Sequence, residues 1–110
     1  MSSKMAQSPT KLSLAHLRKS CDVVEVVEHW NSFVRQRKDL FGIIDIIALR
    51  GEETIAIQST SWGNVSARIK KMSESENIGF IRKANWRILV HGWRKNAKTK
   101  RYELKEVDIS

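Results

Sequence analysis

The chain has 110 residues, and its 20 Lys and Arg residues outnumber its 12 Asp and Glu residues, which gives a formal net charge of +8. A chain of this length forms one domain, because two separate hydrophobic cores would each be too small to be stable. The positive charge favours a polyanionic partner, and the absence of a run of about eighteen apolar residues argues against a membrane-spanning protein.

Residues 1–11 are polar and contain the only proline, which predicts a flexible tail ahead of a single domain over residues 12–110. This first stretch lacks the apolar centre of a signal peptide. The single cysteine, Cys21, has no partner for an internal disulfide, which favours a reducing compartment. We therefore expect a cytoplasmic protein that does not associate with membranes.

The first helix is predicted to begin at Ser13, whose hydroxyl is suited to cap it, and to end near Asp22. Its core face consists of residues at helical spacing: Leu14, Leu17 and Cys21. The stretch over residues 23–30 is rich in β-branched residues and predicts a strand. We expect Trp30, at the end of this strand, to lie in the hydrophobic core, as we do for Trp86.

Residues 41–49 are so uniformly apolar that we expect a central strand covered on both faces. A short glycine turn then leads into residues 54–60, which are predicted to form the antiparallel neighbour. Strand alternation places Asp45 on one face of the first strand, and it places Gln58 and Thr60 together on one face of the second. Whether the two faces coincide depends on the register, which the sequence leaves open.

A helix is predicted after residue 63, because the apolar spacing changes there from strand-like to helical: Val65, Ile69 and Met72. Asn64 or Ser61 is available as its cap. A short helical turn is expected near residues 78–81, followed by two strands at residues 86–93 and 101–109. The order of helix, three strands, helix and two strands predicts an α/β fold with a mixed central β-sheet flanked by helices.

Asp45 is the most informative residue, because an ionised carboxylate inside an apolar strand is costly unless a cation or strong donors compensate it. A magnesium ion would do so, since it prefers oxygen ligands and keeps positions for water and substrate phosphate. There it would neutralise charge on a phosphodiester and lower the pKa of the attacking water. An ordinary Asp that caps or salt-bridges a helix is an equally weighted alternative.

The order of elements, with Asp45 in GIID and Gln58-Ser59-Thr60 at the end of the next strand, resembles the PD-(D/E)xK nuclease superfamily, over about residues 12–95. The resemblance implies a restriction-endonuclease-like αβββαβ core and a DNA endonuclease. It also implies that Asp45 and Gln58 hold Mg²⁺, or Mn²⁺ in its place, because the Mrr-like branch carries Gln at this position. A structure-selective activity, like that of Holliday junction resolvases, suits the small size, and a homodimer would cut two strands symmetrically.

The chain departs from this family at Thr60, which stands where the family has its catalytic lysine. Lys70 or Arg68 on the following helix is a candidate replacement, with a solvated helix face or a nucleic-acid contact as the alternative role. A second metal-binding acid is also needed. The candidates are three acidic residues that precede the central strand: Glu25, Glu28 and Asp39.

Basic residues form a second constellation, which we expect to contact a phosphate backbone, of DNA rather than RNA. Two lie on the helix after residue 63 and five in the connection between the last two strands: Arg68, Lys71, Arg94, Lys95, Lys98, Lys100 and Arg101. Loss of the motif lysine supports a second hypothesis, a catalytically inactive nucleic-acid-binding protein with a nuclease-like fold. The two hypotheses differ on whether a Lys or Arg nitrogen reaches the pocket of Asp45 and Gln58. Among the histidines, His91 is the candidate for an alternative general base.

Overall fold

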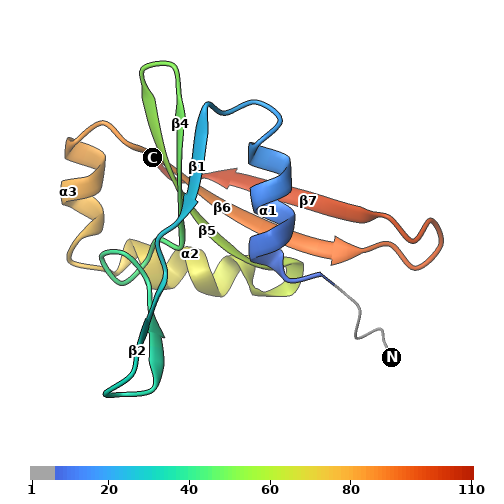
Figure 1. Ribbon diagram of the computed structural model, residues 1–110, viewed down its shortest axis with the longest axis horizontal. Helices are drawn as coiled ribbons and strands as arrows, with labels where there is room; N and C mark the ends of the chain where they lie inside the picture. Colours follow the sequence, from blue (N-terminus) through green and yellow to red (C-terminus); the bar gives the residue numbers. More distant parts are fainter. Residues whose placement is uncertain (1–6) are drawn as a thin grey trace.

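The computed structural model describes residues 7–110 as a mixed five-stranded sheet with helices on both faces, together with a small separate hairpin (Figure 1). The elements, in chain order, are α1 (Pro9–Leu17), β1 (Val23–Val26), β2 (His29–Asn31), β3 (Gln36–Lys38), β4 (Ile46–Arg50), β5 (Glu53–Ser61), α2 (Val65–Ser73), α3 (Ile78–Lys83), β6 (Arg87–Lys95) and β7 (Tyr102–Asp108). A 3-10 turn at Trp62–Asn64 joins β5 to α2.

The strands of the main sheet lie in the order β1-β4-β5-β6-β7. The pairs β1 with β4, β4 with β5 and β6 with β7 are antiparallel, whereas β5 and β6 are parallel. Parallel neighbours need a long crossover connection, and α2 and α3 provide it. The expected α/β class, with a mixed sheet flanked by helices, is therefore confirmed.

The two faces of the sheet bury different hydrophobic clusters, because successive residues of a strand point to opposite sides. On the α1 face, Leu17 packs with Ile46, Ile57 and other strand residues. On the other face, the apolar residues of α2 and α3 pack with strand residues: Val65, Met72, Ile78 and Ile81 with Ala56, Ile88 and Val90. The helical spacing of Val65 and Met72 predicted this packing correctly.

The first helix begins earlier than its sequence pattern indicated. Ser8 is the N-cap, its Oγ accepts a hydrogen bond of 3.2 Å from the backbone N–H of Lys11, and Pro9 takes the first helical position. Residues 9–11, which we expected in the flexible tail, are therefore helical, and residues 1–6 of that tail lie outside the described residues. Ser13 is a fully buried residue inside the helix and not its cap.

The expected strand over residues 23–30 is divided in two. Only β1 joins the main sheet, whereas His29 and Trp30 belong to β2, which pairs with β3 in the separate hairpin. Trp30 is consequently 59% exposed, so its assignment to the core was wrong. Trp86 does pack against the core, as expected.

The apolar run over residues 41–49 is not the central strand. Its first part forms turns, with a bridge between Leu40 and Ile44, and only the part from Ile46 onward is strand β4. The centre of the sheet is β5, which the turn at Gly51 joins to β4 as an antiparallel neighbour, as predicted. None of the helices described in residues 7–110 is long and apolar enough to cross a membrane.

Candidate active site

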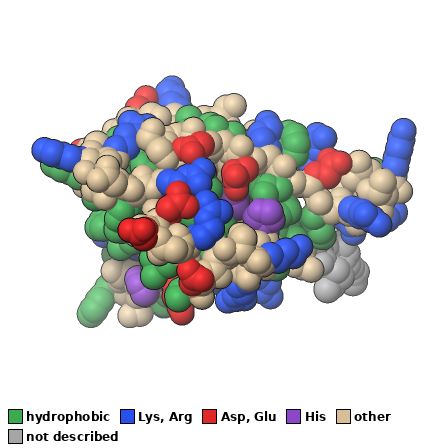
Figure 2. Space-filling view, turned by 90° about the horizontal axis from the view of Figure 1, so that it is seen from above, with side chains coloured by type: hydrophobic (Ala, Val, Ile, Leu, Met, Phe, Trp, Pro, Cys, Tyr) green, Lys and Arg blue, Asp and Glu red, His purple; other side chains and the backbone are tan. Residues whose placement is uncertain are grey.

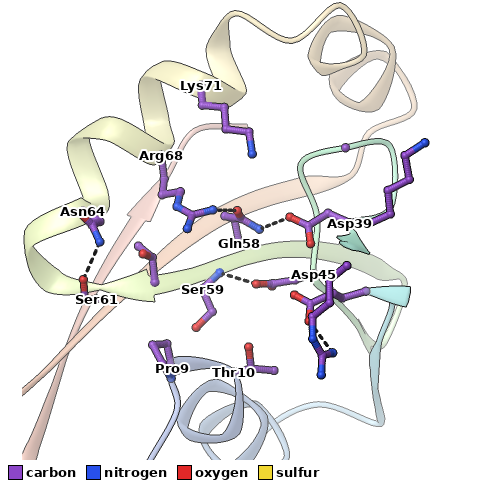
Figure 3. A pocket seen from close by; sticks show the side chains of 15 residues that line it. Pro9, Thr10, Asp39, Asp45, Gln58, Ser59, Ser61, Asn64, Arg68 and Lys71 are labelled. Carbon is purple, nitrogen blue, oxygen red and sulfur yellow. Dashed lines mark hydrogen bonds and ion pairs between the residues drawn. The ribbon is translucent and has the colours of Figure 1, made fainter. Parts of the chain in front are cut away.

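An open pocket of about 620 Å³ lies where the N-terminus of α1, the segment before β4, the end of β5 and the start of α2 meet (Figure 3). It contains the acid, the amide and the threonine that the sequence singled out: Asp45, Gln58 and Thr60. The register pairs Ile46 with Ile57, so Asp45 stands opposite Gln58. The two faces that the sequence left unaligned therefore coincide.

Asp45 is 3% exposed, and its two carboxylate oxygens have different surroundings. Oδ2 accepts a hydrogen bond of 3.1 Å from the backbone N–H of Ser59. Oδ1 has no hydrogen-bond partner. Among the buried side-chain nitrogen and oxygen atoms of residues 7–110, it is the only one without a partner. An unpartnered buried oxygen at a pocket wall is suited to accept a proton or a cation.

Burial raises the pKa of Asp45 from 3.8 to about 7, because removal from water disfavours the charged carboxylate. The N–H of Ser59 opposes this rise, nearby Asp39 and Glu28 add to it, and Arg68 opposes it. A cation at Oδ1 would reverse the effect and keep the carboxylate ionised. Perturbed carboxyl groups in open pockets of this kind are typical of functional sites.

Gln58 lies between two charged residues that hold its amide in one orientation (Figure 3). Its Nε2 donates to Oδ2 of Asp39 at 3.2 Å, and its Oε1 accepts from Nη1 of Arg68 at 2.9 Å. In the reversed orientation the amide N–H groups would face the guanidinium of Arg68, and the amide oxygen would face the carboxylate of Asp39. The charges of these two neighbours therefore assign the orientation of the amide. The amide oxygen is thus used by Arg68, whereas Asp39 brings a second carboxylate to the pocket.

The residues present fit a magnesium ion held mainly by carboxylates. Asp45 and Asp39 line one pocket, and magnesium needs only one or two carboxylates when water fills the other positions. Of the other acids named from the sequence, Glu28 also lines this pocket but pairs with Arg37 at 3.0 Å, and Glu25 does not line it. Within the described part of the chain, no three His, Cys, Asp or Glu side chains are grouped to hold a metal.

Arginine and lysine side chains do line the pocket, and they come from both β3 and α2. Arg68 and Lys71 both line it, whereas Lys70, the first candidate from the sequence, does not. Residues three apart share a helix face, but a residue two positions from Arg68 points to nearly the opposite side. Thr60 also lines the pocket and is 5% exposed.

The five basic residues expected between the last two strands lie in a different part of the molecule, two at the end of β6 and three in its connection to β7: Arg94, Lys95, Lys98, Lys100 and Arg101. None of them lines the Asp45 pocket, and Arg94, Lys95 and Lys98 border a shallower one. Figure 2 shows Lys and Arg side chains at the end of the molecule that this hairpin forms, and mixed charges over the middle. Arg94 pairs with Glu103 at 2.7 Å and stacks 3.8 Å from the ring centre of Trp62, so part of its charge is used internally.

A buried polar network behind Ser59 was not foreseen. Oγ of Ser13 lies 2.8 Å from Oγ of Ser59 and 2.8 Å from Nδ1 of His91, and it accepts from Nε1 of Trp93 at 2.9 Å. Nε2 of His91 lies 2.9 Å from a carboxylate oxygen of Glu106. Burial lowers the pKa of His91, so its ring is neutral near pH 7.

These contacts fix the direction of each hydrogen bond. Neutral His91 donates from Nε2 to Glu106, so its Nδ1 must accept from the single O–H of Ser13. Ser59 must then donate its O–H to Ser13, which leaves only acceptor lone pairs of Ser59 Oγ for the pocket. His91 is therefore occupied by Ser13 and Glu106 and does not line the pocket as a general base.

Comparison of the chain with models of protein families, with curated proteins and with solved structures finds no match. The chemistry of the pocket follows from its own residues. Those residues are a buried carboxylate with a free oxygen, a second carboxylate close by, and two cationic side chains on the facing helix.

Proposed function

We propose that this protein is a metal-dependent nuclease of the PD-(D/E)xK kind, which hydrolyses DNA phosphodiesters in the Asp45 pocket. The observation that carries the proposal is the buried Asp45 with its unpartnered Oδ1, set beside Arg68 and Lys71 in an open pocket. The element order supports it, because α1, β1, β4, β5, α2 and β6 follow the αβββαβ sequence of that superfamily once the separate β2–β3 hairpin and the short α3 are set aside.

In this mechanism the protein residues divide into anionic and cationic sides of the pocket. Asp45 and Asp39 would hold Mg²⁺, which when bound neutralises phosphate charge and lowers the pKa of a bound water. Arg68 and Lys71 contact the non-bridging phosphate oxygens from the opposite side. Arg68 takes the task of the missing motif lysine, and Gln58 is a positioning residue that holds Arg68 and Asp39 in place.

The substrate we propose is DNA recognised by shape and backbone charge. Basic side chains from several elements surround the pocket: Arg37, Lys38, Arg68 and Lys71. Contacts of this kind carry no sequence information, because they reach phosphates and not base edges. A structure-selective endonuclease is the activity that fits this surface, and a dimer would cut both strands of a symmetric junction.

A catalytically inactive nucleic-acid-binding protein is the second candidate. Two observations favour it: Thr60 occupies the lysine position, and the amide oxygen of Gln58 is held by Arg68 instead of facing a cation. Such a protein would use the same basic surface to bind DNA. It would bind with strong salt dependence and leave the DNA intact.

The decisive experiment measures cleavage of labelled single-stranded, duplex and branched DNA with Mg²⁺ or Mn²⁺ and with EDTA. The native protein is compared with Asp45→Asn, which keeps the shape of the side chain but removes its charge. Glu52→Gln, at an exposed turn position, is the matched control. Metal-dependent cleavage lost only in Asp45→Asn supports the nuclease, whereas salt-sensitive binding without cleavage in either metal supports the second candidate.

A further inference from the structure

The β2–β3 hairpin carries an apolar group that the nuclease proposal does not use. Phe33, at its tip, is 98% exposed, and Trp30 and Val34 are 59% and 56% exposed. Figure 1 shows this hairpin projecting away from the sheet and its helices. A single exposed apolar residue is ordinary, but three on one short projecting element indicate an interaction surface.

The shape of the tip is held by polar contacts and not by packing of Phe33. Oδ1 of Asn31 accepts from the backbone N–H of Phe33 at 3.0 Å and from that of Val34 at 3.4 Å. Arg35 closes the turn in the left-handed region, with φ of 52°. The ring of Phe33 is thus presented on a defined turn, so little conformational entropy is lost when it binds.

The charge around these apolar residues is positive. Residues 29–38 contain Arg35, Arg37 and Lys38 and no acidic residue. Within residues 7–110, Arg37 forms an ion pair, with Glu28, whereas Arg35 and Lys38 form none. A projecting aromatic ring can stack on bases, and cations without ion-pair partners can contact the phosphates beside them. An apolar protein groove would match only the ring, and an acidic peptide would match only the cations.

The base of the hairpin is part of the candidate active site, because Arg37 and Lys38 line the Asp45 pocket. At the rise of a β-strand, the backbone of Phe33 lies at most about 13 Å from that of Arg37. This distance corresponds to roughly four nucleotides along one DNA strand. A ring inserted into DNA at the tip would therefore hold a nearby phosphodiester at the pocket.

We propose that the β2–β3 hairpin is a wedge that inserts the Phe33 ring between bases of DNA where stacking is already interrupted, as at a branch point. The inference rests on the proposed nuclease function, for which it names the feature of the substrate that is recognised. Unstacking an intact duplex costs a few kcal/mol per step, whereas a branch point has lost part of that stacking beforehand. The wedge therefore selects branched over continuous duplex DNA.

The test measures binding in EDTA, so that cleavage does not interfere. Branched DNA and duplex DNA of the same length, each with 2-aminopurine at its centre, are titrated with native protein, Phe33→Ala and Phe33→Trp. Phe80→Ala is the matched control, because Phe80 is a 72% exposed aromatic residue on α3 and far along the chain from the hairpin. Because both residues are exposed, neither substitution should unfold the protein, and circular dichroism checks this.

We expect Phe33→Ala to weaken binding to branched DNA roughly ten-fold and to abolish the 2-aminopurine signal, with duplex binding nearly unchanged. Phe33→Trp should restore both, and Phe80→Ala should match the native protein. Equal affinity of Phe33→Ala and native protein for branched DNA would overturn the wedge. The wedge would also be overturned if Phe33→Ala lost binding to anionic vesicles, or lost self-association, while its binding to DNA did not change.

The outcomes for the wedge and for catalysis are separable. Phe33-dependent binding without any metal-dependent cleavage would retain the wedge and reject the nuclease. Cleavage that requires Asp45 but is unaffected on branched DNA by Phe33→Ala would retain the nuclease and reject the wedge.

Discussion

Nη1 of Arg68 donates a hydrogen bond of 2.9 Å to Oε1 of Gln58, and this contact joins α2 to the central strand at the pocket. The same amide donates to Asp39 from its other end. One neutral side chain therefore bridges a guanidinium and a carboxylate within a single pocket. This arrangement leaves Arg68 with further N–H groups for a phosphate, since a guanidinium carries five.

Arg68 is expected to supply the cationic contribution to cleavage. Arg68→Ala should lower the cleavage rate by about 10²-fold or more, the usual effect of removing one donor that stabilises developing charge. Arg68→Lys should recover part of the rate, because it restores the charge but not the planar guanidinium. Lys70→Ala is the control and should cut normally. Equal losses for Arg68→Ala and Lys70→Ala would contradict the assignment.

Asp45 is expected to make the metal-free protein less stable as pH rises. The folded protein keeps Asp45 protonated up to about pH 7, whereas the unfolded chain releases this proton near pH 3.8. The folded state therefore binds more protons between these values, and the free energy of unfolding falls across that window by roughly 4 kcal/mol. Above the window this contribution changes no further.

The check is urea unfolding in EDTA at pH 4 and pH 8, with native protein and Asp45→Asn. Because Asn does not titrate, the variant should lose less stability than the native protein between the two pH values. Addition of Mg²⁺ at pH 8 should stabilise the native protein and leave Asp45→Asn unchanged, since ligands stabilise only the state that binds them. Parallel pH profiles for both proteins would show that Asp45 is not protonated in the fold.

Much of the site followed from local patterns in the sequence. The tight Gly51 turn predicted β4 and β5 as a hairpin, and strand alternation placed Gln58 and Thr60 on one face, whereas only the observed register shows that Asp45 shares it. The helical spacing after residue 63 likewise located α2 and the residues by which it packs on the sheet. The features that were predicted depend on residues close together in the sequence, within the windows of roughly 11–18 residues over which periodicity is informative.

The rest depends on how distant segments pack. Asp39 is in a turn between two sheets, and its contact with Gln58 spans 19 residues. Ser13 looked like a helix cap because a buried serine and a capping serine have the same sequence signature, and its partners lie 46 to 80 residues away. The β2–β3 hairpin could not be predicted from the sequence, because residues 23–30 resemble one continuous strand, although the chain leaves the main sheet after Val26.

Gly92 is expected to control the position of α2 against the sheet. A Cβ atom added there overlaps with Cγ2 of Val65, the first residue of α2, and lies 3.2 Å from Cα of Trp62. Gly92→Ala should therefore destabilise the protein by roughly 1–3 kcal/mol, the usual cost of overpacking. Gly63→Ala, where no atom lies within 4 Å of the new Cβ, is the control. Equal unfolding midpoints in urea would show that α2 moves away without cost.

Ser13 is expected to be more important for stability than Ser59, although both are buried serines in one network. Ser13→Ala removes the shared partner of two buried groups, Ser59 Oγ and His91 Nδ1, and of the partly buried Trp93 Nε1. Ser59→Ala removes one hydrogen bond, that to Ser13, and its backbone N–H still donates to Asp45. Each buried polar group left without a partner costs about 1–3 kcal/mol.

Urea unfolding at pH 7 should consequently show a clearly larger loss for Ser13→Ala than for Ser59→Ala. The double variant is informative as well, because the two substitutions remove the same hydrogen bond and their effects should not add. Ser20→Ala, at an exposed serine beyond the end of α1, controls for the loss of a hydroxyl as such. Equal losses for Ser13→Ala and Ser59→Ala would mean that water replaces Ser13 as the partner of His91 and Trp93, and that the hydroxyl direction of Ser59 is not fixed by His91.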